Sequence, residues 1–177
     1  CRFPARDDYR VRIQEAGRRV GQVLAERGVV SRYGVDFLAH RDAPTAEWTL
    51  TALEINLRMG GTTHPYLALQ FLTGGMLEPE SGLYRSPSGQ SKYYKATDNL
   101  FSERYQGLLP EDLVEILTFN KLHYSHGTAS GVLFHLIGAL SEFGKIGLTA
   151  IANSHEQADQ LYAHTLEILD AETQYGR

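Results

Sequence analysis

The sequence predicts an α+β protein of two parts, in which antiparallel strands pack with helices and a small α/β extension follows. Three observations predict it. An apolar stripe of helical period opens the chain, two segments of alternating apolar and polar residues follow, and helix and strand patterns return after a long irregular stretch. We place the boundary after residue 75, so that the first part covers residues 1–75 and the second covers residues 76–177.

The first predicted element is a helix from Asp7 to Arg27. Acidic residues at positions 7 and 8 suit its start, and Gly28 suits its end. Its apolar residues recur at the spacing that places them on one helix face: Ile13, Ala16, Val20, Val23 and Leu24.

Two strands of an antiparallel hairpin are predicted next, from the alternation over residues 33–38 and 53–58 around a turn at residues 40–47. If the hairpin turns near its midpoint, Asp36 lies across from Glu54 and both side chains point to one face. The opposite, buried face then takes the apolar residues Val35, Phe37, Leu53, Ile55 and Leu57.

Oxygen ligands gather on the polar face of this hairpin. Asp36, Glu54 and Asn56 would offer two carboxylates and an amide oxygen, which suit Mg²⁺ that keeps several waters and completes its shell with phosphates. Arg58 follows on the same face as a bidentate anion donor, and Gly60-Gly61 lets the backbone approach a ligand closely. The stretch indicates a cation site joined to an anion site, although an exposed polar strand face is the plainer reading.

A helix follows the Gly-Gly turn. Thr63 or His64 suits its cap, Pro65 its first turn, and Gly74-Gly75 its end. The free N–H groups at the start of this helix would face the anion site.

The second part begins with an irregular stretch rich in Gly, Ser, Pro and Tyr, over residues 76–107, with one better strand candidate from Lys92 to Ala96. A helix is then predicted from Pro110 to Phe119, because its first turn is acidic. Further predictions are buried strands over residues 131–140 and 145–152, a turn near Gly144, and a terminal helix after the capping box from Ser154 to Gln157.

The run from Arg32 to Phe37, followed by the run from Leu53 to Gly61, resembles the end of the ATP-grasp domain. The resemblance implies that Asp36, Glu54 and Asn56 hold the Mg²⁺ ions that bridge the ATP phosphates. It also implies that Arg58 stabilises acyl-phosphate chemistry.

The residues expected to contact ATP or substrate surround these positions: Arg32, Gly60, Gly61, Thr63 and His64. Arg32 falls opposite Arg58 in the predicted register, so it either shares the anion or fills the rim. His64 falls where the family places a substrate contact, yet helix capping explains it equally well.

The second part resembles the extension of the pheganomycin-type peptide ligases, a branch of the ATP-grasp enzymes. The matching segments are Tyr94 with Asp98-Asn99-Leu100, then residues 109–113, 131–135 and 138–147. The resemblance implies an ATP-dependent ligase that joins a small-molecule or peptide carboxylate to an amine through an acyl phosphate, with ATP and Mg²⁺ as cofactors.

The upstream nucleotide-binding portion expected of such an enzyme is missing from this sequence. We therefore expect the isolated chain to be inactive and to need that amino-terminal portion as its partner. Two rival interpretations stay open: a non-catalytic lobe that positions substrate or forms a homodimer, and a small metal-dependent hydrolase. The role of His123, His126 and His135 is also open, since their spacing lacks the pattern of known zinc sites.

Composition excludes several other classes of function. With 17 Lys and Arg against 21 Asp and Glu, the net charge of -4 does not favour binding to nucleic acid. A single cysteine excludes an internal disulfide and suits a cytoplasmic protein. The longest apolar stretch, residues 131–140, is too short to span a membrane.

Overall fold

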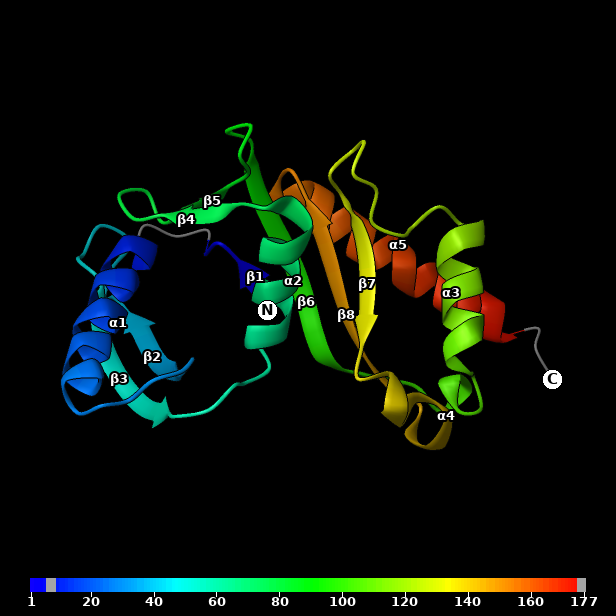
Figure 1. Cartoon of the computed structure of the whole chain (residues 1–177), viewed down its shortest axis with the longest axis horizontal. Coiled ribbons are helices and arrows are strands. Elements are labelled where there is room, and N and C mark those ends of the chain that lie inside the picture. Colours follow the sequence, from blue (N-terminus) through cyan, green and yellow to red (C-terminus); the bar gives the residue numbers. More distant parts are fainter. Residues whose placement is uncertain (6–8, 175–177) are drawn as a thin grey trace.

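The computed structural model describes residues 1–5 and 9–174 (Figure 1). The predicted α+β class is confirmed: a two-stranded and a six-stranded sheet are present among these residues, with every strand pair antiparallel and helices packed beside them. Within the same residues, no helix combines the length and the apolar character needed to cross a bilayer.

The first body of the molecule consists of α1 (Tyr9–Glu26) and the hairpin of β2 (Gly34–His40) and β3 (Thr49–Asn56). The helix and the hairpin are confirmed; the predicted acidic start of the helix lies outside the described residues. The Tyr33 hydroxyl donates to the Gly17 carbonyl at 3.2 Å, and the rings of Tyr9 and Trp48 meet edge to face at 4.9 Å. These contacts attach α1 to both strands.

The predicted register of the hairpin is confirmed at the site. Asp36 lies directly opposite Glu54, and Gly34 lies opposite Asn56. A β-bulge follows, because the next pair joins Phe37 to Ala52 and leaves Leu53 without a partner.

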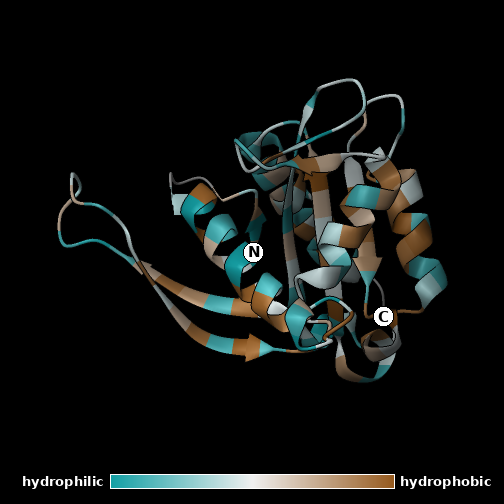
Figure 2. Cartoon of the chain, turned by 60° about the vertical axis from the view of Figure 1, so that its left-hand side comes forward, coloured by the Kyte–Doolittle hydropathy of each residue, from teal (hydrophilic) through white to brown (hydrophobic). Residues whose placement is uncertain are grey.

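The prediction that Leu53, Ile55 and Leu57 are buried is wrong, since 65%, 47% and 58% of their surfaces are exposed. The bulge takes Leu53 out of the ladder, and α1, the helix that lies on the hairpin, has no buried residue of its own. Figure 2 shows the hairpin projecting as an arm with hydrophobic stretches along both strands. A single helix leaves much of this apolar surface uncovered.

The second body is a sheet with the strand order β4-β5-β6-β8-β7, to which β1 adds beside β6. The short outer strands are β1 (Arg2–Phe3), β4 (Met76–Glu78) and β5 (Leu83–Arg85). The long strands are β6 (Ser91–Phe101) and β8 (Lys145–Ala152), with β7 (Gly131–His135) at the other edge.

The central strand β6 is more than twice as long as the predicted segment from Lys92 to Ala96. Its inward residues include a buried lysine, which breaks the apolar alternation that sequence reasoning relies on. The Lys92 ammonium group is satisfied by the Gln90 side chain at 3.0 Å, by the Ala129 carbonyl at 3.0 Å, and by Asn153. This lysine thereby ties β6 to the loop before β7 and to the end of β8.

Helices cover both faces of the sheet (Figure 1). On one face, α2 (Thr63–Thr73) buries Leu69 against Tyr84, Tyr94 and Ile151. On the other, α5 (His155–Gln174) packs Leu161, Tyr162 and Leu166 on a core of Leu122, Val132, Leu148 and Ala150. The domain boundary at residue 75 stays a prediction, although α2 shares its core with the second part.

The remaining helices lie toward the carboxyl end: η1 (Glu103–Tyr105), α3 (Pro110–Phe119), η2 (Ile137–Ala139) and α4 (Leu140–Phe143). The predicted bounds of α3 and β8 are confirmed. The strand predicted over residues 131–140 is wrong beyond His135, because Leu136 adopts a left-handed conformation with φ 56° and starts η2. Gly144 ends α4 with φ 61°, which confirms the predicted turn.

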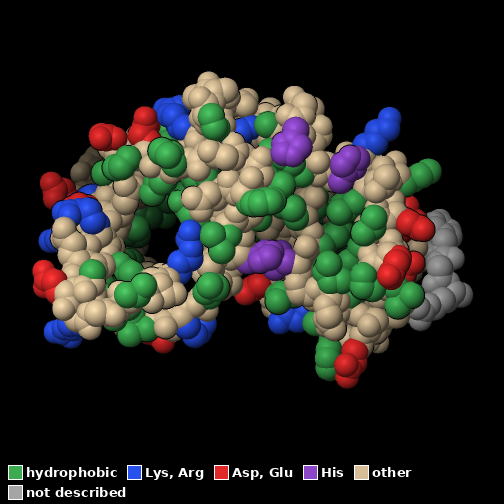
Figure 3. Space-filling view, in the orientation of Figure 1, with side chains coloured by type: hydrophobic (Ala, Val, Ile, Leu, Met, Phe, Trp, Pro, Cys, Tyr) green, Lys and Arg blue, Asp and Glu red, His purple; other side chains and the backbone are tan. Residues whose placement is uncertain are grey.

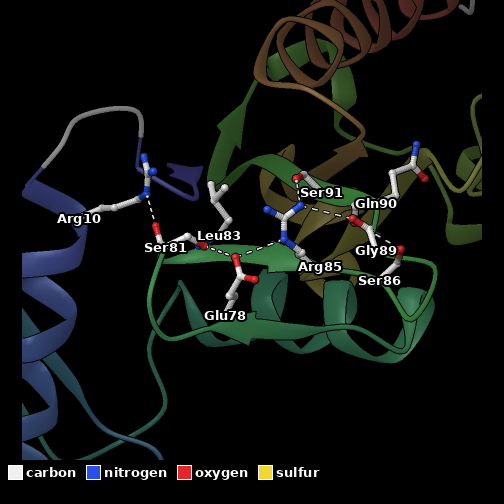
Figure 4. Close-up of polar contacts among 9 residues, drawn as sticks. All are labelled: Arg10, Glu78, Ser81, Leu83, Arg85, Ser86, Gly89, Gln90 and Ser91. Carbon is white, nitrogen blue, oxygen red and sulfur yellow. Dashed lines mark hydrogen bonds and ion pairs between the residues drawn. The ribbon is translucent and has the colours of Figure 1, made fainter.

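Polar contacts join the two bodies at the turn between β4 and β5 (Figure 4). Arg10 Nε donates to the Ser81 carbonyl at 2.9 Å, and Gln14 Nε2 donates to the Pro79 carbonyl at 3.0 Å. The turn itself is braced by the ion pair of Arg85 with Glu78 at 3.2 Å. Two of the contacts that hold the hairpin body beside the sheet are thus hydrogen bonds to backbone carbonyls.

Candidate functional site

A pocket of about 340 Å³ lies where the end of the hairpin meets the start of α2 and the middle of β6. Figure 3 shows the surface hollowed between the hairpin body and α2, with basic side chains at the edge. The hairpin contributes Tyr33, Gly34, Asp36, Asn56 and Arg58, the turn before α2 contributes residues 60–63, and Cys1 and residues 96–98 complete the lining. The hairpin and the sheet therefore share one cavity.

The predicted metal ligands are brought close together on the hairpin. Asn56 Nδ2 donates to Asp36 Oδ2 at 3.5 Å, and Glu54 is the cross-strand neighbour of Asp36. Asp36 and Asn56 line the pocket, whereas Glu54 lies outside its lining. Two carboxylates and an amide are the hard oxygen donors that fit Mg²⁺, so the side chains present suit the predicted ion.

Arg58 lies two residues beyond the end of β3 and lines the same pocket. One of its nitrogens, Nη1, donates to the carbonyl of the neighbouring Met59 at 3.2 Å. Among the described residues it forms no ion pair, so the guanidinium group faces the pocket as an available anion donor.

The cap of α2 differs from the prediction of Thr63 or His64. Thr62 occupies the N-cap position without a side-chain hydrogen bond, and Thr63 is the first helical residue. The Thr63 hydroxyl instead accepts the Gly60 N–H at 3.1 Å, which folds the Gly-Gly turn back onto the helix. Gly60, Gly61 and Thr63 all line the pocket, as expected of a backbone that approaches a ligand.

A carboxylate that sequence reasoning did not assign to the site also lines the pocket. Asp98 lies in a bulge of β6, and its Oδ2 is 2.3 Å from the place where a Cβ on Gly61 would stand. The turn therefore has an acidic side chain beside Gly61 and open space beside Gly60. The Asp98-Asn99 pair, polar residues at the point where the burial of β6 ends, was the available signal.

Arg32 lies apart from this pocket. Its guanidinium group stacks over the Tyr66 ring at 5.3 Å, and Nη2 is 3.5 Å from Gln70 Oε1. It lines a second hollow with Thr62, Thr63 and Tyr94. The structure thus does not bring Arg32 and Arg58 to one pocket.

The ring of His64 packs against that of His135 at a tilt of 35°, with ring centroids 4.5 Å apart. His135 is only 7% exposed, and neither of its ring nitrogens has a hydrogen-bond partner among the described residues. Its ring lies across Gly147, where an added Cβ would be 2.2 Å from Cδ2 and Nε2. Burial and, to a smaller extent, the neighbouring His64 lower the pKa of His135, while Asp98 acts in the opposite direction.

The other histidines lie elsewhere. The ring of His126 packs edge to face on Tyr124 at 5.4 Å, and His123 bridges to Val132 through its backbone. In the described part of the chain, no group of three or more His, Cys, Asp or Glu side chains is arranged to hold a metal ion.

The comparison with known proteins confirms the resemblance to the carboxyl-terminal part of ATP-grasp ligases. Residues 112–165 match the family described as the PGM1 C-terminal domain, which confirms the resemblance to the pheganomycin-type ligases. An L-propargylglycine–L-glutamate ligase from Streptantibioticus cattleyicolor is 38% identical over 159 residues, which cover 90% of this chain and 32% of that protein. The chain therefore spans about a third of the length of this relative. No solved structure matches the chain.

Proposed function

We propose that the chain is part of an ATP-dependent carboxylate–amine ligase that forms peptide bonds through an acyl phosphate. The observation that carries the proposal is the pairing of Asp36 with Glu54 on the hairpin, with Asn56 at the end of β3 and Arg58 just beyond it. The ligase relative and the family match favour the same class of reaction.

In the proposed reaction a carboxylate oxygen attacks the γ-phosphorus of ATP, and the bond to ADP breaks. The resulting acyl phosphate is then attacked at its carbonyl carbon by an amine. The C–N bond forms, inorganic phosphate leaves, and the nitrogen loses a proton. No covalent link to the protein is required.

The residues of the pocket have separate roles in this proposal. Asp36, Glu54 and Asn56 would hold Mg²⁺, which offsets phosphate charge when it is bound. The Arg58 guanidinium would stabilise charge that develops on the transferred oxygens, because fixed donors in a partly enclosed site need no reorganisation during the reaction. Gly60, Gly61 and Thr63 would shape the floor beneath the reacting groups.

The proposed substrates are amino acids or short peptides. The relative is named for joining L-propargylglycine to L-glutamate, and each of these carries both a carboxylate and an amine. We place the reaction in the cytoplasm, where ATP is supplied. The remainder of a full-length ligase would provide the nucleotide pocket.

The test is Glu54→Gln in the full-length protein, assayed for ATP-dependent coupling of pairs of L-amino acids by mass spectrometry of the amide. We expect kcat/KM to fall by on the order of 100-fold or more, since a neutral amide weakens the ion that positions the phosphates. The control is Glu47→Gln, which removes an exposed charge at the far end of the same hairpin. Full activity in Glu54→Gln would favour a non-catalytic substrate-positioning or dimerisation lobe instead.

A further inference from the structure

The pocket has two sides of different chemistry. The hairpin side carries Asp36, Asn56 and Arg58, which the proposed function assigns to Mg²⁺ and phosphate. The opposite side is formed by the bulge of β6, where Asp98 is the charged residue in the lining. A second reactant would therefore meet a carboxylate.

Asp98 does not take part in the pairing of β6 with β8. Its bulge interrupts the ladder of β6 with β8 between Thr97 and Leu100, so that its side chain leaves the sheet pattern and reaches over Gly61. Among the described residues no hydrogen bond or ion pair holds this exposed carboxylate. Cys1 also lines the pocket, and its backbone nitrogen donates to the Ala96 carbonyl rather than to Asp98.

Asp98 also does not join the predicted metal ligands. Asp98, Asp36 and Glu54 would form a three-carboxylate cluster if they converged, yet the described residues contain no such cluster arranged around an ion. A carboxylate so close to the Gly-Gly turn disfavours a phosphate at that spot, because like charges repel. The Asp98 side of the pocket is thus suited to a cation that is not the metal.

The residues next to Asp98 on β7 and β8 do not offset its negative charge. Gly147 of β8 lies between the bulge of β6 and His135 of β7, and the His135 ring rests on it. This imidazole is 7% exposed and has no hydrogen-bond partner on either nitrogen among the described residues. Burial lowers its pKa, so a neutral ring lies beside Asp98 at physiological pH. The His64 ring packs over it.

We propose that Asp98 binds the ammonium group of the amine substrate and holds it across the pocket from Arg58. The inference rests on the proposed ligase function and adds the residue that recognises the second substrate. Both reactants then share one cavity of about 340 Å³, with the anionic acyl phosphate at the hairpin and the nitrogen at the sheet. The bound ammonium group loses one proton to water before its nitrogen attacks, and a second proton leaves after the C–N bond has formed. An ammonium ion is the class of ligand that a free carboxylate recognises by charge-assisted hydrogen bonds.

The test separates the two halves of the reaction in the full-length protein. The first assay measures amide formation from the L-amino acid pair that gives the highest rate, with the amine concentration varied. The second replaces that amine by hydroxylamine, which is uncharged at pH 7.5 and traps an acyl phosphate as a hydroxamate. The variants are Asp98→Asn and Asp98→Glu, with Glu111→Gln as a control that removes one exposed charge at the start of α3.

We expect Asp98→Asn to raise KM for the amine by at least about tenfold, the loss of one charge-assisted contact, and to leave hydroxamate formation within about twofold of wild type. Asp98→Glu keeps the charge and is expected to have a lower amine KM than Asp98→Asn. An unchanged amine KM in Asp98→Asn, equal KM values in the two variants, or an equal loss of amide and hydroxamate would each overturn the inference. If the wild type forms no hydroxamate, the proposed function fails and this inference fails with it.

Discussion

Two buried polar side chains of the sheet differ in their hydrogen bonding. Lys92 is 1% exposed and has three acceptors around its ammonium group, whereas His135 is 7% exposed and has none among the described residues. A buried polar group without a partner costs free energy. His135 is therefore a residue whose protonation should affect stability.

Acid should destabilise the protein through His135. Burial lowers its folded-state pKa, so the neutral form supports the fold above the ordinary histidine pKa of about 6.5. That support is lost as the pH falls through the lower folded value, because the unfolded chain then binds the extra proton. Urea unfolding between pH 7.5 and pH 5 measures the effect. His64 and Asp98 are the titratable neighbours that face this ring.

His135→Gln is the comparison for this prediction, since glutamine is polar but does not titrate. We expect its unfolding free energy to decline less steeply over the same pH range than that of the wild type. Identical slopes in the two proteins would show that His135 does not contribute to the acid sensitivity. A His126→Gln variant, at a ring that packs on Tyr124 away from the site, controls for the loss of a histidine.

At the level of single residues, sequence reasoning reached only part of the site. Asp36 and Glu54 could be paired because a strand has a period of two, so one correct turn fixes which residues face each other. Asp98 was missed, because it comes close to Gly61 only through a bulge of β6 and the turn before α2, which lie far apart in the sequence. No local pattern encodes that approach.

Among the elements, the turn at Gly144 leads to a prediction about the free energy of unfolding. Its φ is 61°, and a Cβ there would lie 2.2 Å from the Ser102 carbonyl oxygen, which belongs to the backbone and cannot swing away. We expect Gly144→Ala to lower the free energy of unfolding by about 2–4 kcal/mol, from the left-handed conformation and the clash together. Chemical denaturation measures this change.

Gly17→Ala is the matched substitution for that experiment. Gly17 lies inside α1, and nothing stands within 4 Å of its added Cβ. Alanine favours a helix over glycine by up to about 1 kcal/mol, so this variant should be unchanged or slightly more stable. A similar loss of stability in both variants would mean that the backbone at Gly144 is not the cause.

The elements themselves were predicted well where a single signal dominates. The acidic first turn fixed the start of α3, and the mostly apolar run from Ile146 to Ala152 fixed β8, because both patterns are local. β6 was underestimated because the polar residues Thr97 and Asp98 interrupt its pattern, although its pairing with β8 continues to Phe101. β7 was overestimated because the apolar run continues past His135 into a helix.

For the whole molecule, we expect the contact between the hairpin body and the sheet to open locally more readily than the sheet itself. Arg10 and Gln14 cross it by donating to carbonyls of the β4-β5 turn. We expect the double variant Arg10→Ala/Gln14→Ala to speed amide hydrogen exchange in α1 while the exchange of β6 and β8 stays unchanged. Hydrogen exchange followed by mass spectrometry measures both regions at once.

Arg18→Ala is the control for this contact. Arg18 is also a basic residue of α1, but it pairs with Glu15 on the same helix at 2.8 Å rather than with the sheet. Its removal should leave the exchange of α1 nearly unchanged, because exposed ion pairs contribute little. If Arg18→Ala accelerates exchange as much as the double variant does, the contacts at the β4-β5 turn are not what holds α1.

The first strand has a practical consequence for protein engineering. β1 pairs Arg2 with Lys95 and Phe3 with Tyr94, and the Phe3 ring stacks on Tyr94 at 5.3 Å. The sheet thus recruits a segment that precedes α1 and the hairpin in the polypeptide. A chimaeric ligase that takes up this lobe should include residues 2–3 and α2. A graft that begins at β4 would expose the Tyr94 ring and the part of β6 that pairs with β1.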